Sequence, residues 1–185
     1  MTQQLIKDTQ DKMDASLKVL ENQLAGIRTG KASPALVENI QVPYYGAPTR
    51  MRDLANISTP ETRLIVISPY DPTVLAEIVR SILAANIGVT PQNDGRVVRV
   101  PVPELSEERR KEMSKVAARN GEEAKVSIRN VRRDANESAK KLQKDAKISE
   151  DDLKNTLDKI QKSTDKAIEK TDAMVKAKET EVMNV

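Results

Sequence analysis

The segment IRTGKASP, residues 27–34, predicts the end of a long helix and the start of a different kind of structure. Gly30 stands where a residue in the left-handed conformation commonly follows a helix, and Pro34 prevents the helix from resuming. Upstream, apolar residues recur at spacings of seven, four and three, which places them on one stripe of a helix over about residues 2–29. The stripe comprises Ile6, Met13, Leu17, Leu20, Leu24 and Ile27.

Proline is confined to one part of the chain, because all nine prolines lie within residues 34–103. Proline interrupts helices, so the proline-free stretches on either side can form long unbroken helices. Two such stretches, far apart in the sequence, can share one bundle. We therefore expect residues 1–30 and 105–185 to form a bundle domain and residues 31–104 to form a domain inserted into it.

The stretch after residue 105 predicts two further helices. Ser106 precedes the first, which we expect to run to about residue 146, and Ser149 with Asp152 has the capping-box spacing that begins the second. The apolar stripe of the first comprises Met113, Val116, Ala117, Ala124, Ile128, Val131, Ala135, Leu142 and Ala146. The stripe of the second comprises Leu153, Leu157, Ile160, Thr164, Ala167, Ile168, Thr171, Met174, Val175 and Val182. Three long helices with such narrow stripes predict an elongated bundle.

The inserted segment has the pattern of a small β/α/β domain. β-branched residues over 62–67 are typical of a strand, and Asp71 followed by Pro72 is typical of a helix start. The other expected elements are an extended stretch over 35–42, turns at Tyr44-Tyr45-Gly46 and Asp94-Gly95, and a strand over 96–100. The predicted fold class is therefore α+β: an elongated three-helix bundle with an inserted small β/α/β domain.

Two strands of chain join the inserted domain to the bundle, and this double connection predicts a limited hinge. Such a connection allows pivoting but resists free tumbling. The predicted hinge residues are Gly30 and Lys31 in one strand, and Pro101, Pro103, Glu104 and Leu105 in the other.

The composition argues against an enzyme. The chain has no cysteine and no histidine, so it lacks thiolate metal ligands and the commonest general base. The glycines of residues 26–33 resemble a phosphate loop, but their spacing is one residue short and a helix precedes them. The pair Asp151-Asp152 fits a helix start better than a catalytic pair. We expect no catalytic residues, no cofactor and no metal site.

The chain also lacks the patterns of membrane and secreted proteins. No apolar run approaches the roughly 18 residues of a membrane span. The opening MTQQLIKDTQDK has neither a signal-peptide core nor the composition of a transit segment. We expect a cytoplasmic protein that does not bind membranes.

Positive charge is concentrated in residues 105–147, which hold thirteen lysines and arginines against eight acidic residues. On a helical projection the basic residues gather on one arc and most of the acids on the other. The basic arc comprises Lys111, Lys115, Lys125, Arg129, Arg132, Arg133 and Lys140.

Two interpretations of this basic arc remain open. It is either a solvated face supported by ion pairs or a surface that binds phosphate groups. All three tyrosines lie in the insert, so the bundle has no ring on which a base could stack. Folded RNA, recognised by shape and phosphate contacts, is therefore the nucleic acid that the bundle suits best.

The sequence also bears on two functions other than RNA binding. The helical spacing also permits a non-catalytic adaptor protein that binds partner helices, with its charges serving only solubility. A small hydrolase would need a nucleophile and a base, and the sequence offers no such pair.

Six segments of the sequence resemble, in order and spacing, the signatures of the bacterial ribosome recycling factor family. The resemblance runs from end to end of the chain. The segments are IRTGKASPALVENI at 27–40, YYG at 44–46, LSEERRKEM at 105–113, AKVSIRNVRRDAN at 124–136, ISEDD at 148–152 and QKSTDKAI at 161–168.

The resemblance implies a near-L-shaped, tRNA-like molecule with a three-helix bundle and a hinged inserted domain. It implies binding to the post-termination ribosome, with the bundle on rRNA of the large subunit. Elongation factor G, which hydrolyses GTP, would then drive separation of the subunits for a new round of translation. This chain would hydrolyse nothing itself, and we expect it to be a monomer.

The resemblance also assigns RNA-binding residues. Arg132 matches the principal rRNA-contacting arginine of the family, and Arg129 lies beside it in the same motif. Arg28 and Arg110 match further basic positions at the tip of the bundle.

Two more RNA-binding residues, Lys125 and Arg133, are predicted from the helical arc alone. The sequence departs from the family pattern at Lys31, where arginine is usual, and at Arg50, where proline is common. Lys31 keeps the charge but loses the planar guanidinium fork.

Overall fold

A computed structural model describes residues 1–184. The chain divides into two compact units. The first, the bundle unit, consists of Met1–Thr29 and Glu107–Asn184. The second, the inserted unit, consists of Gly30–Ser106.

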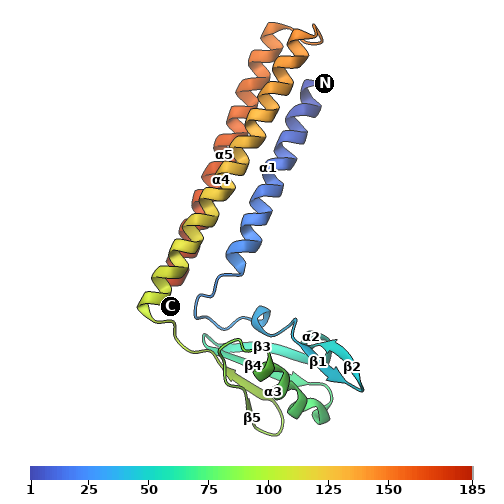
Figure 1. Cartoon of the computed structure of the whole chain (residues 1–185), viewed down its shortest axis with the longest axis vertical. Coiled ribbons are helices and arrows are strands. Elements are labelled where there is room, and N and C mark those ends of the chain that lie inside the picture. Colours follow the sequence, from blue (N-terminus) through green and yellow to red (C-terminus); the bar gives the residue numbers. More distant parts are fainter. Residues whose placement is uncertain (185) are drawn as a thin grey trace. The chain divides into compact units, whose positions relative to one another are not determined.

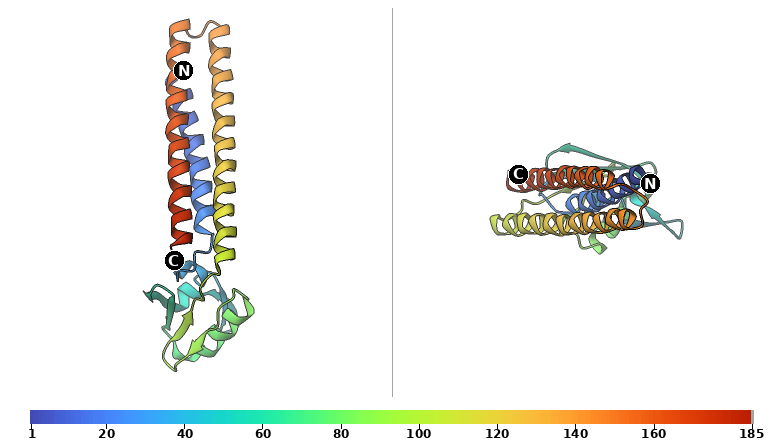
Figure 2. Two further views of the ribbon diagram at one scale, coloured as in Figure 1. Left: turned by 90° about the vertical axis from the view of Figure 1, so that its left-hand side faces the viewer. Right: turned by 90° about the horizontal axis from the view of Figure 1, so that it is seen from above.

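Three helices make up the bundle unit: α1 (Thr2–Ala25), α4 (Glu107–Lys144) and α5 (Glu150–Met183). They lie side by side, with α1 and α5 running in one direction and α4 in the other (Figure 1 and Figure 2). The predicted α+β fold with a long three-helix bundle is confirmed. Residues 1–29 and the C-terminal part of the chain share this bundle although the whole inserted unit separates them in sequence.

The first helix ends four residues earlier than predicted, at Ala25 rather than at residue 29. Gly26 follows the helix with φ −75°, and its amide donates to the carbonyl of Asn22. Ile27 is nevertheless buried in the bundle core, so the apolar stripe extends two residues beyond the end of the helix. Gly30 has the predicted positive φ, 80°, but it lies within the loop.

The core of the bundle is narrow and rich in small residues. Its buried apolar side chains include Leu20, Ile128 and Ile160, each with no exposed surface. The predicted stripes are largely confirmed, except that Ala146 is exposed and lies beyond the end of α4. The inward positions Thr9, Gly121, Ala139 and Thr156 were missed. These residues have little or no hydrophobic signal of their own, so periodicity did not reveal them.

Buried threonines in the bundle satisfy their hydroxyl groups within their own helix. Thr164 and Thr171 donate to the carbonyls of Ile160 and Ala167 at 2.8 and 2.9 Å. Thr156 donates in the same way to Asp152 at 2.7 Å. Because these bonds remove the cost of burying an unpaired hydroxyl, threonine can occupy a core position here.

The start of α5 has the predicted capping box. The Ser149 hydroxyl accepts from the Asp152 amide at 3.0 Å, and the Asp152 carboxylate accepts from the Ser149 amide at 3.2 Å. The bonds from Ser149 hold the pKa of the Asp152 carboxyl below its usual value. The chain therefore turns sharply from α4 into α5 and pairs the two long helices.

The inserted unit contains two antiparallel sheets. One is the hairpin of β1 (Gln41–Tyr44) and β2 (Ala47–Arg50). The other has the strand order β3-β4-β6-β5. Its strands are β3 (Ala55–Glu61), β4 (Leu64–Pro69), β5 (Gln92–Asn93) and β6 (Val98–Pro101), and the unit's helices are α2 (Met51–Leu54) and α3 (Leu75–Ala84).

The core of the inserted unit lies between α3 and the strands. Ile65 and Ile67 of β4 and Ile78 of α3 are fully buried in it. Asp71 caps the turn before α3, as predicted, by accepting from the Thr73 amide at 3.0 Å. The predicted tight turns are confirmed by Gly46 at φ 79° and Gly95 at φ 90°.

One predicted element of the inserted unit was wrong. Residues 35–42 were expected to be extended, but Pro34–Leu36 form a 3-10 helix and the strand begins only at Gln41. Ser33 caps this short helix by accepting from the Ala35 amide at 3.3 Å, and proline suits its first position. Local capping therefore overrides the apolar pattern.

Gly121 provides a direct test of bundle packing. A methyl group at this position would lie 2.5 Å from Cγ2 of Val175, whose β-branched side chain has little rotamer freedom on a helix. We expect Gly121→Ala to lower the free energy of unfolding by about 1 kcal/mol net, because overpacking outweighs the gain in helix propensity. Thermal denaturation followed by circular dichroism would measure it.

The matched control is Gly26→Ala, where the nearest atom to the added methyl group is 3.5 Å away. This variant should be neutral or slightly stabilising. The double variant with Val175→Ala should recover part of the loss, and an unchanged melting temperature for Gly121→Ala would show that the helices are not in close contact there.

Candidate nucleic-acid interface

Three arginines of α4, Arg129, Arg132 and Arg133, form a group that we call the arginine cluster. Arg133 is exposed, and the other two are half-buried. Within residues 1–184, none of the three has a carboxylate oxygen at salt-bridge distance. The positive charges of three neighbouring guanidinium groups are therefore not neutralised by carboxylates of the described chain. This favours binding of an external anion to this part of α4.

Arg132 lies at the edge of α4 that faces α5. Its Nη1 donates to Oε1 of Gln161 at 3.5 Å, a long hydrogen bond to a neutral group. Gln161 is the first residue of the segment QKSTDKAI at 161–168, none of whose residues was predicted to bind RNA. The residues of α5 beside the arginine cluster were therefore missed as part of the site. The one signal that pointed to them was the resemblance of QKSTDKAI to a segment of the family.

Lys125 does not belong with the arginine cluster. Its Nζ lies 2.6 Å from the Asp172 carboxylate of α5 and 3.2 Å from Glu122, and its side chain is only 17% exposed. The hydrogen bond to Asp172 raises the pKa of the Lys125 ammonium despite partial desolvation. Lys125 was predicted on the same basic arc as the three arginines, but within the described chain it has, unlike them, carboxylate partners, one of which lies on a different helix.

Arg28 and Arg110 lie near the end of the bundle where α1 ends and α4 begins. At about 1.5 Å per residue, Arg110 is roughly 33 Å from Arg132 along α4. Arg28 is exposed, whereas Arg110 is half-buried and its Nε is buried without a hydrogen-bond partner among the described residues. The predicted RNA-binding residues therefore form two groups rather than one.

The predicted hinge residues differ in how firmly they are held within the inserted unit. Pro101 is the last residue of β6 and pairs with Leu64, and Glu104 forms an ion pair with Arg63. Two of the four predicted hinge residues in this connecting segment therefore have contacts within the inserted unit. The backbone next to Pro101 is also held, because the Val102 amide donates to the Arg63 carbonyl at 2.8 Å.

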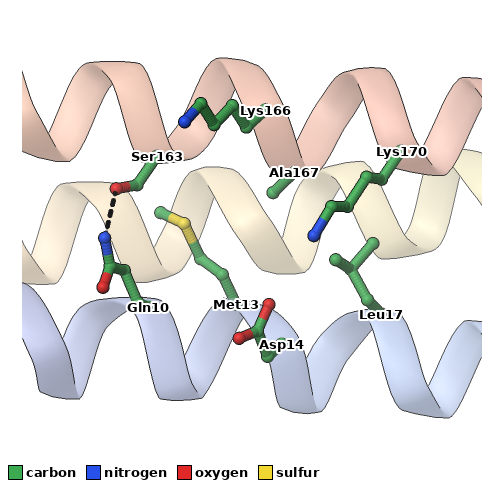
Figure 3. A pocket seen from close by; sticks show the side chains of 8 residues that line it. All are labelled: Gln10, Met13, Asp14, Leu17, Ser163, Lys166, Ala167 and Lys170. Carbon is green, nitrogen blue, oxygen red and sulfur yellow. Dashed lines mark hydrogen bonds between the residues drawn. The ribbon is translucent and has the colours of Figure 1, made fainter.

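A groove of about 180 Å³ lies between α1 and α5 (Figure 3). Its apolar floor includes Met13 and Leu17, and Gln10 donates to the Ser163 hydroxyl across it at 3.2 Å. Its remaining lining residues are Asp14, Lys166, Ala167 and Lys170.

The tyrosines of the inserted unit combine packing and exposure. Tyr44 and Tyr45 make an edge-to-face contact with ring centroids 4.6 Å apart. Burial raises the pKa of the Tyr44 phenol, and its hydrogen bond to Asp71, 3.2 Å long, acts in the same direction. Tyr45 and Tyr70 are 86% and 73% exposed, whereas Tyr44 is partly buried.

Over residues 1–184, no three acidic side chains come together in a way that could hold a metal ion. None of the helices in that range has the length and apolar character needed to cross a membrane.

The fold defines a class of α+β proteins in which a small antiparallel-sheet unit is inserted after the first helix of a long three-helix bundle. A family model described as "Ribosome recycling factor" matches residues 20–183. Ribosome-recycling factors of Geobacillus sp. (strain WCH70) and Pelotomaculum thermopropionicum are 49% and 47% identical to this chain, with complete coverage of each sequence. The chain belongs to the ribosome recycling factor family, and the resemblance seen in the sequence is confirmed.

Solved structures agree with this assignment. A solution structure of the ribosome recycling factor aligns with a TM-score of 0.77 and 38% identity, covering 100% of this chain and 98% of that one. A second, with a TM-score of 0.65, 38% identity and 98% coverage of both chains, belongs to a set described as models for the T. thermophilus ribosome recycling factor and E. coli elongation factor G bound to the E. coli post-termination complex.

The two ion pairs of Lys125 predict a structural role that mutation can isolate. We expect Lys125→Met to lower the free energy of unfolding by about 0.5–1 kcal/mol. The pKa of Lys125 is raised above its ordinary 10.5, so this contribution should be present at neutral pH and lost as the pH rises through the raised pKa. Denaturation at pH 7 and at successively more alkaline pH, compared with wild type, would measure both effects.

Proposed function

We propose that this protein recycles ribosomes. It binds the post-termination ribosome and, together with elongation factor G and GTP hydrolysis by that factor, separates the ribosome into its subunits. Membership of the ribosome recycling factor family supports this proposal. So does the structural neighbour whose description names elongation factor G on a post-termination complex.

The interface with the large subunit is the arginine cluster on α4, and its partner is rRNA. The observation that carries this assignment is that Arg129, Arg132 and Arg133 lack carboxylate partners in the described chain, whereas Lys125 on the same arc has two. Guanidinium groups bind phosphate oxygens through paired donors and release counterions from the RNA. Because the bundle has no aromatic ring for stacking, the target is folded rather than single-stranded RNA.

Arg28 and Arg110 form a second contact region on the bundle. Arg28 is exposed and Arg110 is half-buried, so each has solvent-accessible surface through which its guanidinium group can donate to a phosphate. Lys125 contributes through the α4–α5 ion pair rather than through phosphate. The protein acts as a monomer in the cytoplasm and has no catalytic activity, and the absence of histidine and cysteine from its sequence supports the second point.

The two chain crossings serve as a hinge in this function. The bundle anchors on large-subunit RNA while the GTPase pushes the inserted unit, and stiff helices transmit the force to the contacts between subunits. Gly30, which has a positive φ, supplies motion in the first crossing, to which Lys31 also belongs, and Pro103 and Leu105 supply it in the second. Pro101 and Glu104 contribute less, because the sheet and an ion pair hold them.

Disassembly of purified post-termination ribosomes, with elongation factor G and GTP, tests the proposal. Arg132→Ala should weaken binding to large subunits and slow disassembly, and it should lower the slope of log affinity against log salt by about one. Helix content should not change, because a half-exposed arginine contributes little to folding. Binding assays at several salt concentrations and circular dichroism would measure these effects.

Arg109→Ala is the matched control on the same helix, since Arg109 pairs with Glu112 at 3.1 Å and lies outside the basic arc. Wild-type affinity and salt slope for Arg132→Ala would contradict the RNA interface. Salt-insensitive binding by the wild type would instead favour the adaptor function.

Replacement of Gly30 tests the hinge separately from binding. Gly30→Val places a β-branched residue at φ 80°, which costs about 1–3 kcal/mol locally. We expect disassembly to slow severalfold while large-subunit affinity changes little. Gly46→Val is the control, because it has similar strain at φ 79° in a turn fifteen residues from the nearest predicted hinge residue. Equal loss of binding and disassembly for Gly30→Val would refute the hinge role.

A further inference from the structure

We infer that Gln161 on α5 is a positioning residue for Arg132: its amide orients the guanidinium group without neutralising its charge. This inference rests on the proposed RNA interface. It concerns a residue of a different helix, to which neither the sequence nor the family comparison gave a role.

The geometry fixes the direction of the Gln161 amide. Its Nε2 donates to Oδ1 of Asp165 at 2.8 Å, one turn further along α5. A carboxylate can only accept hydrogen bonds, so the NH₂ group of Gln161 must face Asp165. The carbonyl oxygen is then left to accept from Nη1 of Arg132 at 3.5 Å.

Lys125 and Arg132 of α4 have different kinds of partner on α5. Asp172 and Glu122 neutralise Lys125, and their distances of 2.6 and 3.2 Å are those of charge-assisted bonds. Arg132 instead meets a neutral amide at a longer distance, and Asp165 contacts the amide rather than pairing with the guanidinium. The ion pair joins the helices, whereas the neutral contact leaves a charge available.

This arrangement suits a group that must bind a phosphate. A guanidinium group has five N–H donors, and the contact with Gln161 uses one of them, which leaves four for phosphate oxygens. A carboxylate at position 161 would hold Arg132 more tightly, but its charge would have to be displaced when RNA binds. Because the amide already restricts the rotamers of Arg132, less side-chain freedom is lost when RNA binds. The neutral amide does this without reducing the positive charge that attracts the phosphate.

Gln161→Glu tests the inference, because it changes one amide to a carboxylate at nearly constant shape. With purified large ribosomal subunits as the probe, we expect about five- to tenfold weaker binding and a salt slope lower by about one. Asn155→Asp is the matched control, since Asn155 is an exposed amide on the same helix, six residues away on another face. It should change affinity by less than about twofold.

A second variant separates orientation from charge. Gln161→Met keeps the length of the side chain and removes the amide, so we expect about two- to threefold weaker binding with an unchanged salt slope. In an Arg132→Ala background, Gln161→Glu should add no loss beyond that of the Asn155→Asp control. This non-additivity is a readout that a purely structural role of Gln161 would not produce.

The outcomes separate this inference from the proposed function. If Gln161→Glu and Gln161→Met bind as wild type while Arg132→Ala is defective, the positioning role is overturned and the RNA interface stands. Additive losses in the double variant would overturn it as well. If Arg132→Ala binds as wild type, the proposed RNA interface fails and the role of Gln161 fails with it.

Discussion

The close approach of α4 and α5 is the constraint on which the rest of the bundle depends. Small residues on the inner face of α4 permit it, and at Gly121 even a methyl group would collide with Val175. Because the helices meet so closely, short polar side chains of α5 reach the basic arc of α4. The pairing of Lys125 with Asp172 and the contact of Arg132 with Gln161 both follow from this spacing.

Much of the fold was predictable because its signals are local. The long helices follow from the absence of proline and from apolar periodicity, and the capping box at Ser149 marks a boundary through hydrogen bonds within four residues. The errors arose where one local preference overrode another. Ser33 and Pro34 formed a short helix in a stretch with a strand pattern, and Gly26 ended α1 before its apolar stripe was complete.

The candidate site was less predictable, because its properties depend on two helices at once. A projection of α4 alone places Lys125 and Arg132 on the same basic arc, yet α5 supplies a carboxylate to one and an amide to the other. Nothing in the spacing of residues along α4 could reveal that difference. The same limit applies to Pro101 and Glu104, whose restraint comes from Leu64 and Arg63 across the sheet.

The distribution of aromatic residues has a practical consequence for spectroscopy. All three tyrosines belong to the inserted unit, and the chain contains no tryptophan, so ultraviolet fluorescence reports on that unit alone. The long helices of the bundle dominate the far-ultraviolet dichroism. Each unit thus carries its own optical signal, and the melting of one can be distinguished from that of the other in a single unlabelled sample.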